Sequence, residues 1–329
     1  MRRLAPVSGY AARMIGISPR QLEVFVAVAA LGSVRAAAEQ LHLTQPAASM
    51  ALAELERRIG VVLFDRARQR LHLNARGRAM LPQAREVLVR MQALERNAAA
   101  SPDELFGELR IGASNTVGSY RVGELLGGFI ALHPQASVQL LVDNTQTVLE
   151  RVLDYSLDVG CVEGPAARSG LDALPWRDDA LCVCARPTHP LASRKRLAPA
   201  DFAGARWILR EHGSATRALV ERELTRLPAG VTVLELGNSE AIKQAVLAGL
   251  GVACLPRVAV RAELAAGELR ILPTPFLDLQ RELSLVLARG RYRGALLQAL
   301  LDTAQAAPLN SAATIKSRAR GARQTAARA

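Results

Sequence analysis

The chain of 329 residues contains only four cysteines, and their spacing excludes the common cysteine chemistries. Cys161, Cys182, Cys184 and Cys254 follow neither the spacing of a zinc site nor that of a redox pair. Each lies in an apolar stretch such as "ALCVCAR" or "GVACLP". Since free cysteine is among the most often buried residues, we expect four reduced thiols inside protein cores.

The five histidines are also too scattered to form a catalytic or metal-binding pattern. No two of them occupy positions i and i+4, the spacing of ligands on one helix face. His212 lies close to Ser214, but neighbouring loop residues rarely present a base to a nucleophile, and the chain has no Gly-x-Ser-x-Gly turn. We therefore expect no catalytic residue, no metal site, no cofactor and no enzymatic activity. The histidines are His42, His72, His133, His189 and His212.

Long apolar runs are absent from the sequence, although half of its residues are apolar. No segment approaches the length of a membrane span, and the N-terminus lacks the apolar stretch of a signal peptide. We therefore expect a cytoplasmic protein with no membrane partner. The length exceeds what a single core supports, which predicts two or more compact units.

Basic residues exceed acidic ones by 12, but the excess is unevenly distributed. Residues 1–17 and 309–329 carry three and five basic residues and no acidic one. Both segments lack an apolar period, so we expect them to be disordered. Residues 18–104 hold 12 arginines against nine acidic residues, whereas residues 105–308 are close to neutral. The N-terminal part is thus the better candidate for binding nucleic acid.

Three short helices are predicted near the N-terminus from their capping residues. One begins after Ser18 and ends at Gly32, Ser33 caps a second, and Thr44 caps a third after the turn "HLT". Two short helices joined by such a turn are typical of a helix-turn-helix. Residues 44–58 would then form the recognition helix that enters the major groove of DNA.

The faces of this third segment support that interpretation. Ala48, Leu52 and Leu55 recur at helical spacing and form an inward face, whereas Met50 and Ala53 lie on an outer face of small side chains. A small, weakly charged outer face is unusual for a solvated helix but fits the deep major groove. The candidate DNA contacts in these helices are Arg35, Thr44, Gln45, Pro46, Ser49 and Met50.

A basic segment follows the third helix. In "VVLFDRARQRLHLN" apolar and basic residues alternate through Arg66, Arg68 and Arg70, which predicts a small hairpin with arginines over DNA phosphates. The alternative is a solvated basic face, which a charge run alone would indicate. The adjacent helix-turn-helix favours the DNA contact.

Residues 20–81 resemble the N-terminal winged helix-turn-helix of LysR-type transcriptional regulators. The resemblance implies a DNA-binding domain at residues 18–76, with double-stranded operator DNA as its partner and RNA polymerase as a further candidate. Met50 departs from the family, since many relatives have arginine or another polar residue there. The matching features are Ala37-Ala38, Gln45-Pro46-Ala47, Leu55-Glu56, Gly60, Leu63-Phe64, Arg66 and Gly77.

A long helix is predicted after the hairpin, from a cap at Asn74 to about Asn97. Its apolar residues follow two neighbouring seven-residue tracks, close to a coiled-coil seam. In LysR-type regulators a linker helix pairs two subunits, so the resemblance implies a dimer or tetramer held through residues 77–100. The alternative is that the helix packs on its own domain. The seam residues are Leu81, Ala84, Val87, Leu88, Met91, Leu94, Glu95 and Ala98.

Residues 107–306 alternate predicted strands and helices after a boundary at residues 101–107. This alternation is typical of an α/β fold with a mostly parallel sheet. By resemblance it is a two-lobed, periplasmic-binding-protein-like effector-binding domain, so the whole chain would be an α/β multidomain protein. Its lobes would be residues 107–178 with 279–306 and residues 179–278.

Two loops at strand ends predict a ligand site between the lobes. Ser114 to Thr116 and Gly213 to Thr216 each precede a helix, and helix N-termini favour anions. Alternatively, these hydroxyls only cap their helices. Glu163 would pair with an arginine, bind a protonated or amino-bearing ligand, or respond to the ligand's own proton. The candidate effector contacts are Ser114, Asn115, Thr116, Glu163, Gly164, Gly213, Ser214 and Thr216.

Together these patterns predict a sequence-specific transcriptional regulator of LysR type. The branch it resembles is related to regulators of sulfur and carbon assimilation, whose effectors are small and often anionic. We therefore expect a small anionic effector to control DNA binding or promoter activation. The alternative is an α/β small-molecule-binding protein or enzyme with an appended DNA-binding domain.

Overall fold

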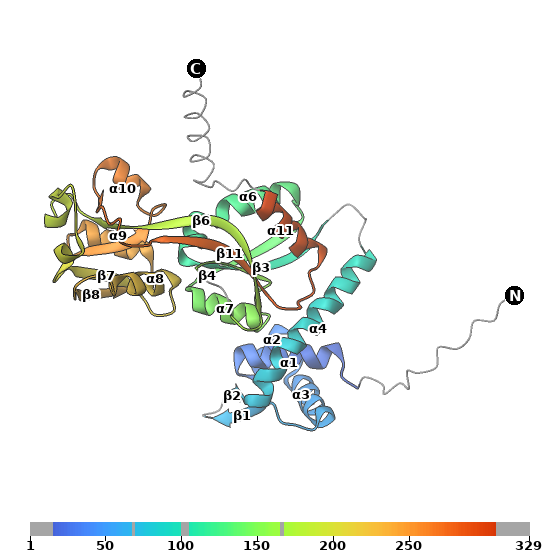
Figure 1. The fold of residues 1–329 in the computed structure, drawn as a ribbon. Coiled ribbons are helices and arrows are strands. Elements are labelled where there is room, and N and C mark those ends of the chain that lie inside the picture. The colour runs from blue at the N-terminus through green and yellow to red at the C-terminus, as the bar shows by residue number, and fades with distance from the viewer. Residues whose placement is uncertain (1–15, 68–69, 100–104, 165–167, 307–329) are drawn as a thin grey trace, which may run out of the picture. The chain divides into compact units, whose positions relative to one another are not determined.

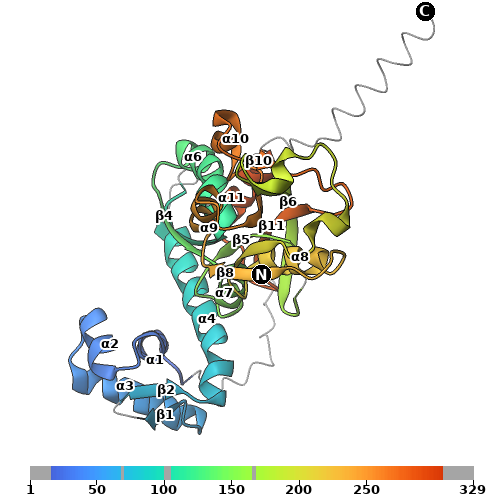
Figure 2. The same ribbon diagram turned by 90° about the vertical axis from the view of Figure 1, so that its left-hand side faces the viewer.

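In the computed structural model the chain divides into two compact units, Met1–Ala99 and Ala100–Ala329, whose elements are labelled in Figure 1 and Figure 2. The wing residue Arg68 and most of the two chain ends predicted to be disordered lie outside the described residues. The described residues are 16–67, 70–99, 105–164 and 168–306.

The first unit contains a helix-turn-helix, a two-stranded hairpin and a long helix. Ser18 caps α1 in a capping box with Gln21, and the Ser33 and Thr44 side chains accept from backbone amides at the starts of α2 and α3. The predicted helix starts are confirmed. The elements are α1 (Pro19–Leu31), α2 (Val34–Gln40), α3 (Gln45–Ile59), β1 (Phe64–Ala67), β2 (Arg70–Leu73) and α4 (Ala75–Ala99).

Small residues allow the helices of this unit to pack closely. Ala37 and Ala38 of α2 are buried in the same core as Phe25 of α1. The hairpin is joined to the helices by the Leu71 amide, which donates to the Gly32 carbonyl at 2.9 Å. This hydrogen bond holds the wing beside the helix-turn-helix.

The first half of α4 packs on its own unit. Leu81 and Ala84 are buried in the core of that unit, and Leu88 packs against it. Leu81 and Ala84 are therefore covered by their own unit and are not open to a second chain, whereas the rest of the predicted seam stays a prediction. Val87 and Leu94 are 44% and 70% exposed, so this flank of the helix is open.

The second unit is an α/β fold built on a mixed sheet. Among the described residues, the strand order is β4-β3-β5-β11-β6-β9-β7-β8, with β10 paired to β6. The strands are β3 (Gly107–Ser114), β4 (Ala136–Asp143), β5 (Val159–Glu163), β6 (Leu171–Ala185), β7 (Arg206–Arg210), β8 (Val231–Leu236), β9 (Val252–Pro256), β10 (Arg270–Ile271) and β11 (Gln280–Ala288). The helices are α5 (Asn115–Tyr120), α6 (Val122–Leu132), α7 (Thr145–Leu153), η1 (Pro190–Ser193), η2 (Pro199–Phe202), α8 (Ala215–Leu224), α9 (Ser239–Leu247), α10 (Arg261–Ala266) and α11 (Ala295–Ala306).

The parallel strand pairs form two separate groups, one in each of two lobes. β3 pairs in parallel with β4 and β5, and β7 pairs in parallel with β8 and β9. β6 and β11 pair antiparallel and run from one lobe into the other, as Figure 1 shows. β6 is the longer of the two and spans 15 residues, and β11 spans nine. Two long strands shared by both lobes therefore connect them.

All four cysteines are free and buried, as predicted. Burial raises the pKa of Cys161 to about 12 and that of Cys182 to about 11. The reactive thiolate is therefore scarce near neutral pH.

No single helix in the described ranges is long and apolar enough to cross a membrane. α1 and α2 pass such a test only as a pair bent by 120°, and their apolar side chains form the core of the first unit. The same ranges contain no cluster of three or more histidine, cysteine or acidic side chains that could hold a metal ion.

Candidate DNA-binding face and effector cavity

The N-terminal half of α3 presents an open face. Thr44, Gln45, Pro46, Ser49 and Met50 are all exposed, while the opposite side of the helix lies in the core of the unit. Five of the predicted DNA contacts thus lie on one exposed stretch of helix. The Pro at the second helical position is tolerated because the first turn has no intrahelical acceptor for its amide.

Arginine and glutamate side chains form ion pairs within α2 and within α3. The side chain of Arg35 is 82% exposed and lies 3.1 Å from Glu39. Glu54 accepts hydrogen bonds from Arg57 and Arg58, and these arginines lower the pKa of Glu54 to about 2. Exposed ion pairs of this kind contribute little stability.

The predicted hairpin is formed by β1 and β2. The strands pair antiparallel, with Arg66 opposite Leu71 and Ala67 opposite Arg70. Arg66 and Arg70 are exposed. The third predicted phosphate contact, Arg68, lies outside the described residues.

In the second unit, the two lobes touch where α7 and α8 begin. The Gln146 amide donates to the Gly213 carbonyl at 3.0 Å, and the Ala215 amide donates to the Thr145 hydroxyl at 3.4 Å. Gly213 has φ +87°, and an added Cβ would lie 3.2 Å from the Gln146 side chain. Glycine is thus required there by conformation and by the close approach of the other lobe.

A second set of contacts between the lobes involves α5 and α9. The Asn115 amide group donates to the Gly237 carbonyl at 3.4 Å. Tyr120 donates a hydrogen bond to Glu240. Burial, followed by this carboxylate, raises the pKa of Tyr120 well above its usual value, so the phenol remains a donor. Helix α5 therefore meets the other lobe, as predicted from its position after a strand end.

Arg281 of β11 connects the two lobes in the interior. Its side chain is only 3% exposed and lies 2.7 Å from Asp179 and 3.6 Å from Glu163. It also donates to the hydroxyls of Thr216 at 2.8 Å and Thr116 at 3.4 Å. Thr116 belongs to one lobe and Thr216 to the other, so one guanidinium holds both. Of the roles left open for Glu163, pairing with an arginine is the one present here.

The serines and threonines at the two predicted helix starts are not equivalent. Ser214 accepts from the Arg217 amide at 3.4 Å and caps α8. Ser114 precedes α5 but makes no capping bond, and its buried hydroxyl has no partner among the described residues. Capping therefore accounts for the acceptor role of Ser214, and it does not account for Ser114, Thr116 or Thr216.

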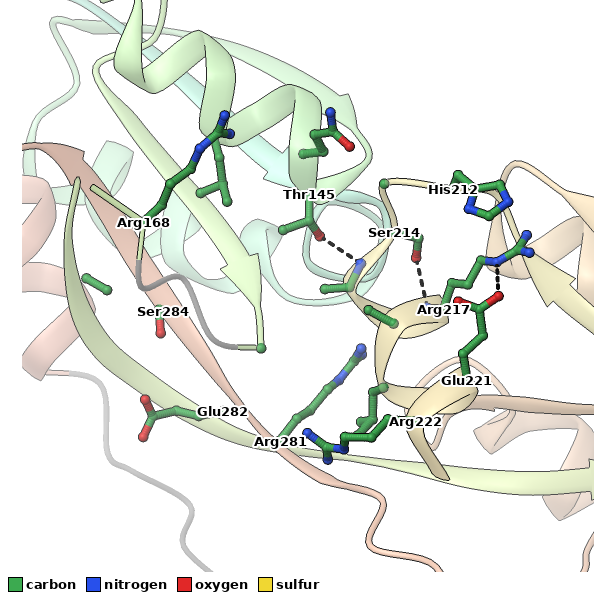
Figure 3. A pocket seen from close by; sticks show the side chains of 18 of the residues that line it. Thr145, Arg168, His212, Ser214, Arg217, Glu221, Arg222, Arg281, Glu282 and Ser284 are labelled. Carbon is green, nitrogen blue, oxygen red and sulfur yellow. Dashed lines mark hydrogen bonds and ion pairs between the residues drawn. The ribbon is translucent and has the colours of Figure 1, made fainter. Parts of the chain in front are cut away.

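A cavity of about 720 Å³ opens between the lobes at the starts of α7 and α8. Figure 3 shows Arg168 on one side of it and His212 and Arg217 on the other. Thr145, Leu149 and Ala173 also line it. The charged residues around the cavity are Arg168, Arg217, Arg222, Arg281, Glu221 and Glu282.

The cavity contains only part of the predicted effector contacts. Gly164, Gly213 and Ser214 line it. The reason is that the helix start facing α8 across the cavity is that of α7, whereas the start of α5 contacts Gly237 and Arg281 instead. The predicted contacts that do not line this cavity are Ser114, Asn115, Thr116, Glu163 and Thr216.

Thr145, Arg168 and Arg281 are among the lining residues that the sequence did not indicate. Thr145 carried the same signal as Ser114, because Asn144 caps a helix directly after a strand. Arg168 and Arg281 carried no local signal, since a lone arginine in a loop or at a strand start is common. Arg217 also lines the cavity, but its guanidinium already bonds Glu221 and Glu235.

The fold and these two sites define a DNA-binding protein with a two-lobed ligand-binding domain. Residues 19–78 match the bacterial regulatory helix-turn-helix proteins of the lysR family, and residues 102–308 match the LysR substrate binding domain. The chain therefore belongs to the LysR family of transcriptional regulators, as its sequence predicted.

Three similar proteins illustrate this membership. The uncharacterized HTH-type transcriptional regulator YeiE of Escherichia coli K12 is 41% identical over 287 residues, which are 87% of this chain and 96% of YeiE. A full-length OxyR variant from Pseudomonas aeruginosa has a TM-score of 0.73 and 24% identity over 88% of this chain and 95% of its own. The regulatory domain of Synechocystis PCC6803 CcmR in complex with 2-PG has a TM-score of 0.58 and 31% identity, covering 62% of this chain and 98% of its own.

Proposed function

We propose that a small anion bound in the cavity between the lobes controls this regulator's DNA binding or promoter activation. The observation that carries the proposal is the placement of Arg168 and Arg222 at the same cavity from different lobes. The ten-residue helix α8 also directs its N-terminus, at Ser214, toward this space. Aligned amides at a helix start attract negative charge. The binding of 2-PG by the CcmR regulatory domain supports a small-molecule ligand in this class of domain.

Arg281 supplies a route from the cavity to the lobe arrangement. It lines the cavity and also bonds Thr116 and Thr216, which lie in different lobes. An anion that attracts this guanidinium would weaken its bonds to one or both threonines. The lobes would then change their relative angle, which is how occupancy would be transmitted to the rest of the protein. Ser114, Asn115, Glu163 and Gly164 would respond indirectly or complete the site after that change.

Arg168→Ala combined with Ser214→Ala is expected to weaken anion binding about tenfold or more, because each change removes a hydrogen bond to a charged group. Calorimetry on the full chain with small oxyanions and carboxylates would measure the effect. Arg196→Ala is the matched control, since Arg196 is exposed and does not line the cavity. Unchanged affinity in the double variant would contradict the cavity assignment.

We infer that α3 reads bases and that the wing binds phosphates. Gln45→Ala should change base preference at a cost of about 1–3 kcal/mol on the preferred site. Arg70→Ala should instead weaken binding to all sequences and reduce the salt slope by about one unit. Anisotropy titrations on a selected duplex and on random DNA separate the two roles. Equal losses on both duplexes in both variants would show that the roles are assigned wrongly.

We also infer self-association through two exposed apolar surfaces. Val87 and Leu94 lie on the open flank of α4. In the second unit, α6 exposes Leu132 and the edge strand β4 exposes Leu140 and Val142. An edge strand with exposed apolar residues favours pairing with another chain. Contact through one of these surfaces would give a dimer, and contact through both would give a tetramer. We also infer that this DNA-binding regulator acts in the cytoplasm.

Leu94→Asp should lower the mass of the assembly, because a carboxylate would replace an apolar contact in the helix pair. Size exclusion with light scattering at micromolar concentration measures this mass. Gln92→Asp is the control, since Gln92 is an exposed polar residue of the same helix. If both variants kept the mass of the unaltered protein, α4 would not form the interface.

A further inference from the structure

Met50 is the most exposed of the large apolar side chains in the described ranges. Its exposed fraction is 73%, and it lies on the outer face of α3. It does not belong to the core formed by Ala48, Leu52 and Leu55 on the other side of the same helix. Packing within the described chain therefore does not explain an apolar residue at this position.

The neighbours of Met50 make it the protruding group of this face. Pro46 and Ala47 precede it by about one turn, and Ala53 follows it by about one turn. All three are short, so the flexible thioether extends beyond the surface that they form. Gln45 and Ser49 are exposed beside it and carry hydrogen-bonding groups.

The major groove offers one apolar group to such a side chain. Base edges there present hydrogen-bond donors and acceptors, and thymine adds its C5-methyl group. A methionine has only a weak acceptor sulfur and cannot replace an arginine or glutamine in reading polar edges. Its unbranched chain can adapt to a methyl group at the floor of the groove.

We propose that Met50 is a specificity-determining residue that recognises a thymine methyl group in each half-site. The proposal rests on α3 being the recognition helix. Gln45, with an amide that suits adenine, would then read the polar edge of a neighbouring A·T pair. The preferred half-site contains a thymine whose methyl group contributes to affinity independently of its hydrogen bonds.

The test uses full-length protein and a duplex selected from a random pool, in which each thymine is replaced singly by deoxyuridine. Deoxyuridine removes the methyl group and keeps the pairing edge. Burial of one methyl group changes affinity about fourfold, so we expect about fourfold weaker binding at one thymine per half-site and about 15-fold when both half-sites are changed. Met50→Ala should bind the thymine and deoxyuridine duplexes equally, whereas Met50→Leu should keep the discrimination.

Three outcomes overturn the proposal. The first is that deoxyuridine has no effect on affinity at any position. The second is that Met50→Ala loses as much affinity on the deoxyuridine duplex as the unaltered protein does. The third is that Met50→Gln discriminates between the thymine and deoxyuridine duplexes as well as Met50→Leu. An unchanged DNA affinity together with loss of a protein partner would assign Met50 to a protein surface instead. Failure to select any duplex would count against the recognition helix itself, which is a different result from equal binding of both duplexes.

Discussion

Arg281→Ala is expected to lower the free energy of unfolding of the second unit by about 3–5 kcal/mol, because removing one partner of a buried ion pair leaves the other uncompensated. Asp179 and Glu163 are both buried and both pair with this guanidinium. The two threonine hydroxyls would also lose their donor. Tryptophan fluorescence during urea unfolding measures the effect specifically, since Trp176 and Trp207 both lie in this unit and are buried.

Two variants show whether the loss comes from the buried network. Arg196→Ala removes an exposed arginine of the same unit and should change the free energy of unfolding by less than about 0.5 kcal/mol. Arg281→Lys keeps the charge, but an ammonium group lacks the planar fork of a guanidinium and cannot bond Asp179 and both threonines at once. Its loss of unfolding free energy should therefore be intermediate. A loss below about 1 kcal/mol in Arg281→Ala would contradict the role of this residue in joining the lobes.

Gly77→Ala is expected to destabilise the first unit by about 3 kcal/mol, near the upper range for overpacking. A Cβ at this position would lie 2.3 Å from the Leu63 carbonyl oxygen and 2.6 Å from the Leu73 side chain. The Gly77 amide also bonds the Asn74 side chain, whose amide group donates to Val62. The added methyl group must therefore displace the start of α4 from the hairpin. DNA affinity should fall with it, because the wing arginines would move.

The control for this variant is Gly16→Ala. There a Cβ would meet only the end of the flexible Arg58 side chain, which can move away. Native-state hydrogen exchange of the amides in α1 to α4 reports on this unit, which contains neither tryptophan. Equal protection in the Gly77 and Gly16 variants would show that the contact at Leu63 tolerates a side chain.

The sequence predicted the first unit well because its structure is set by local chemistry. Ser18, Ser33 and Thr44 each accept an amide within their own helix start. The alternation through Arg66 and Arg70 likewise fixes a short hairpin. The seam of α4 was harder to predict, because helical spacing identifies an apolar face and does not identify the partner that covers it.

The effector cavity was predicted only in part because it depends on which loops meet in space. Ser114 and Thr145 share the same pattern of strand end and helix start, and only the fold places Thr145 opposite α8. Arg281 lies more than 60 residues from Thr216 and more than 160 from Thr116. No spacing in the sequence could indicate that one arginine bonds both.

Anisotropy titration of full-length protein on a selected duplex, with small oxyanions and carboxylates added singly at constant ionic strength, tests the effector claim most directly. Constant ionic strength is needed because salt alone weakens phosphate contacts. At least one anion should change the DNA affinity of the unaltered protein and leave the Arg168→Ala, Ser214→Ala double variant unaffected, and DNA should change the affinity for that anion by the same factor. No effect of any anion, an equal effect in the double variant, or an effect only of a large apolar ligand would contradict control by an anion between the lobes.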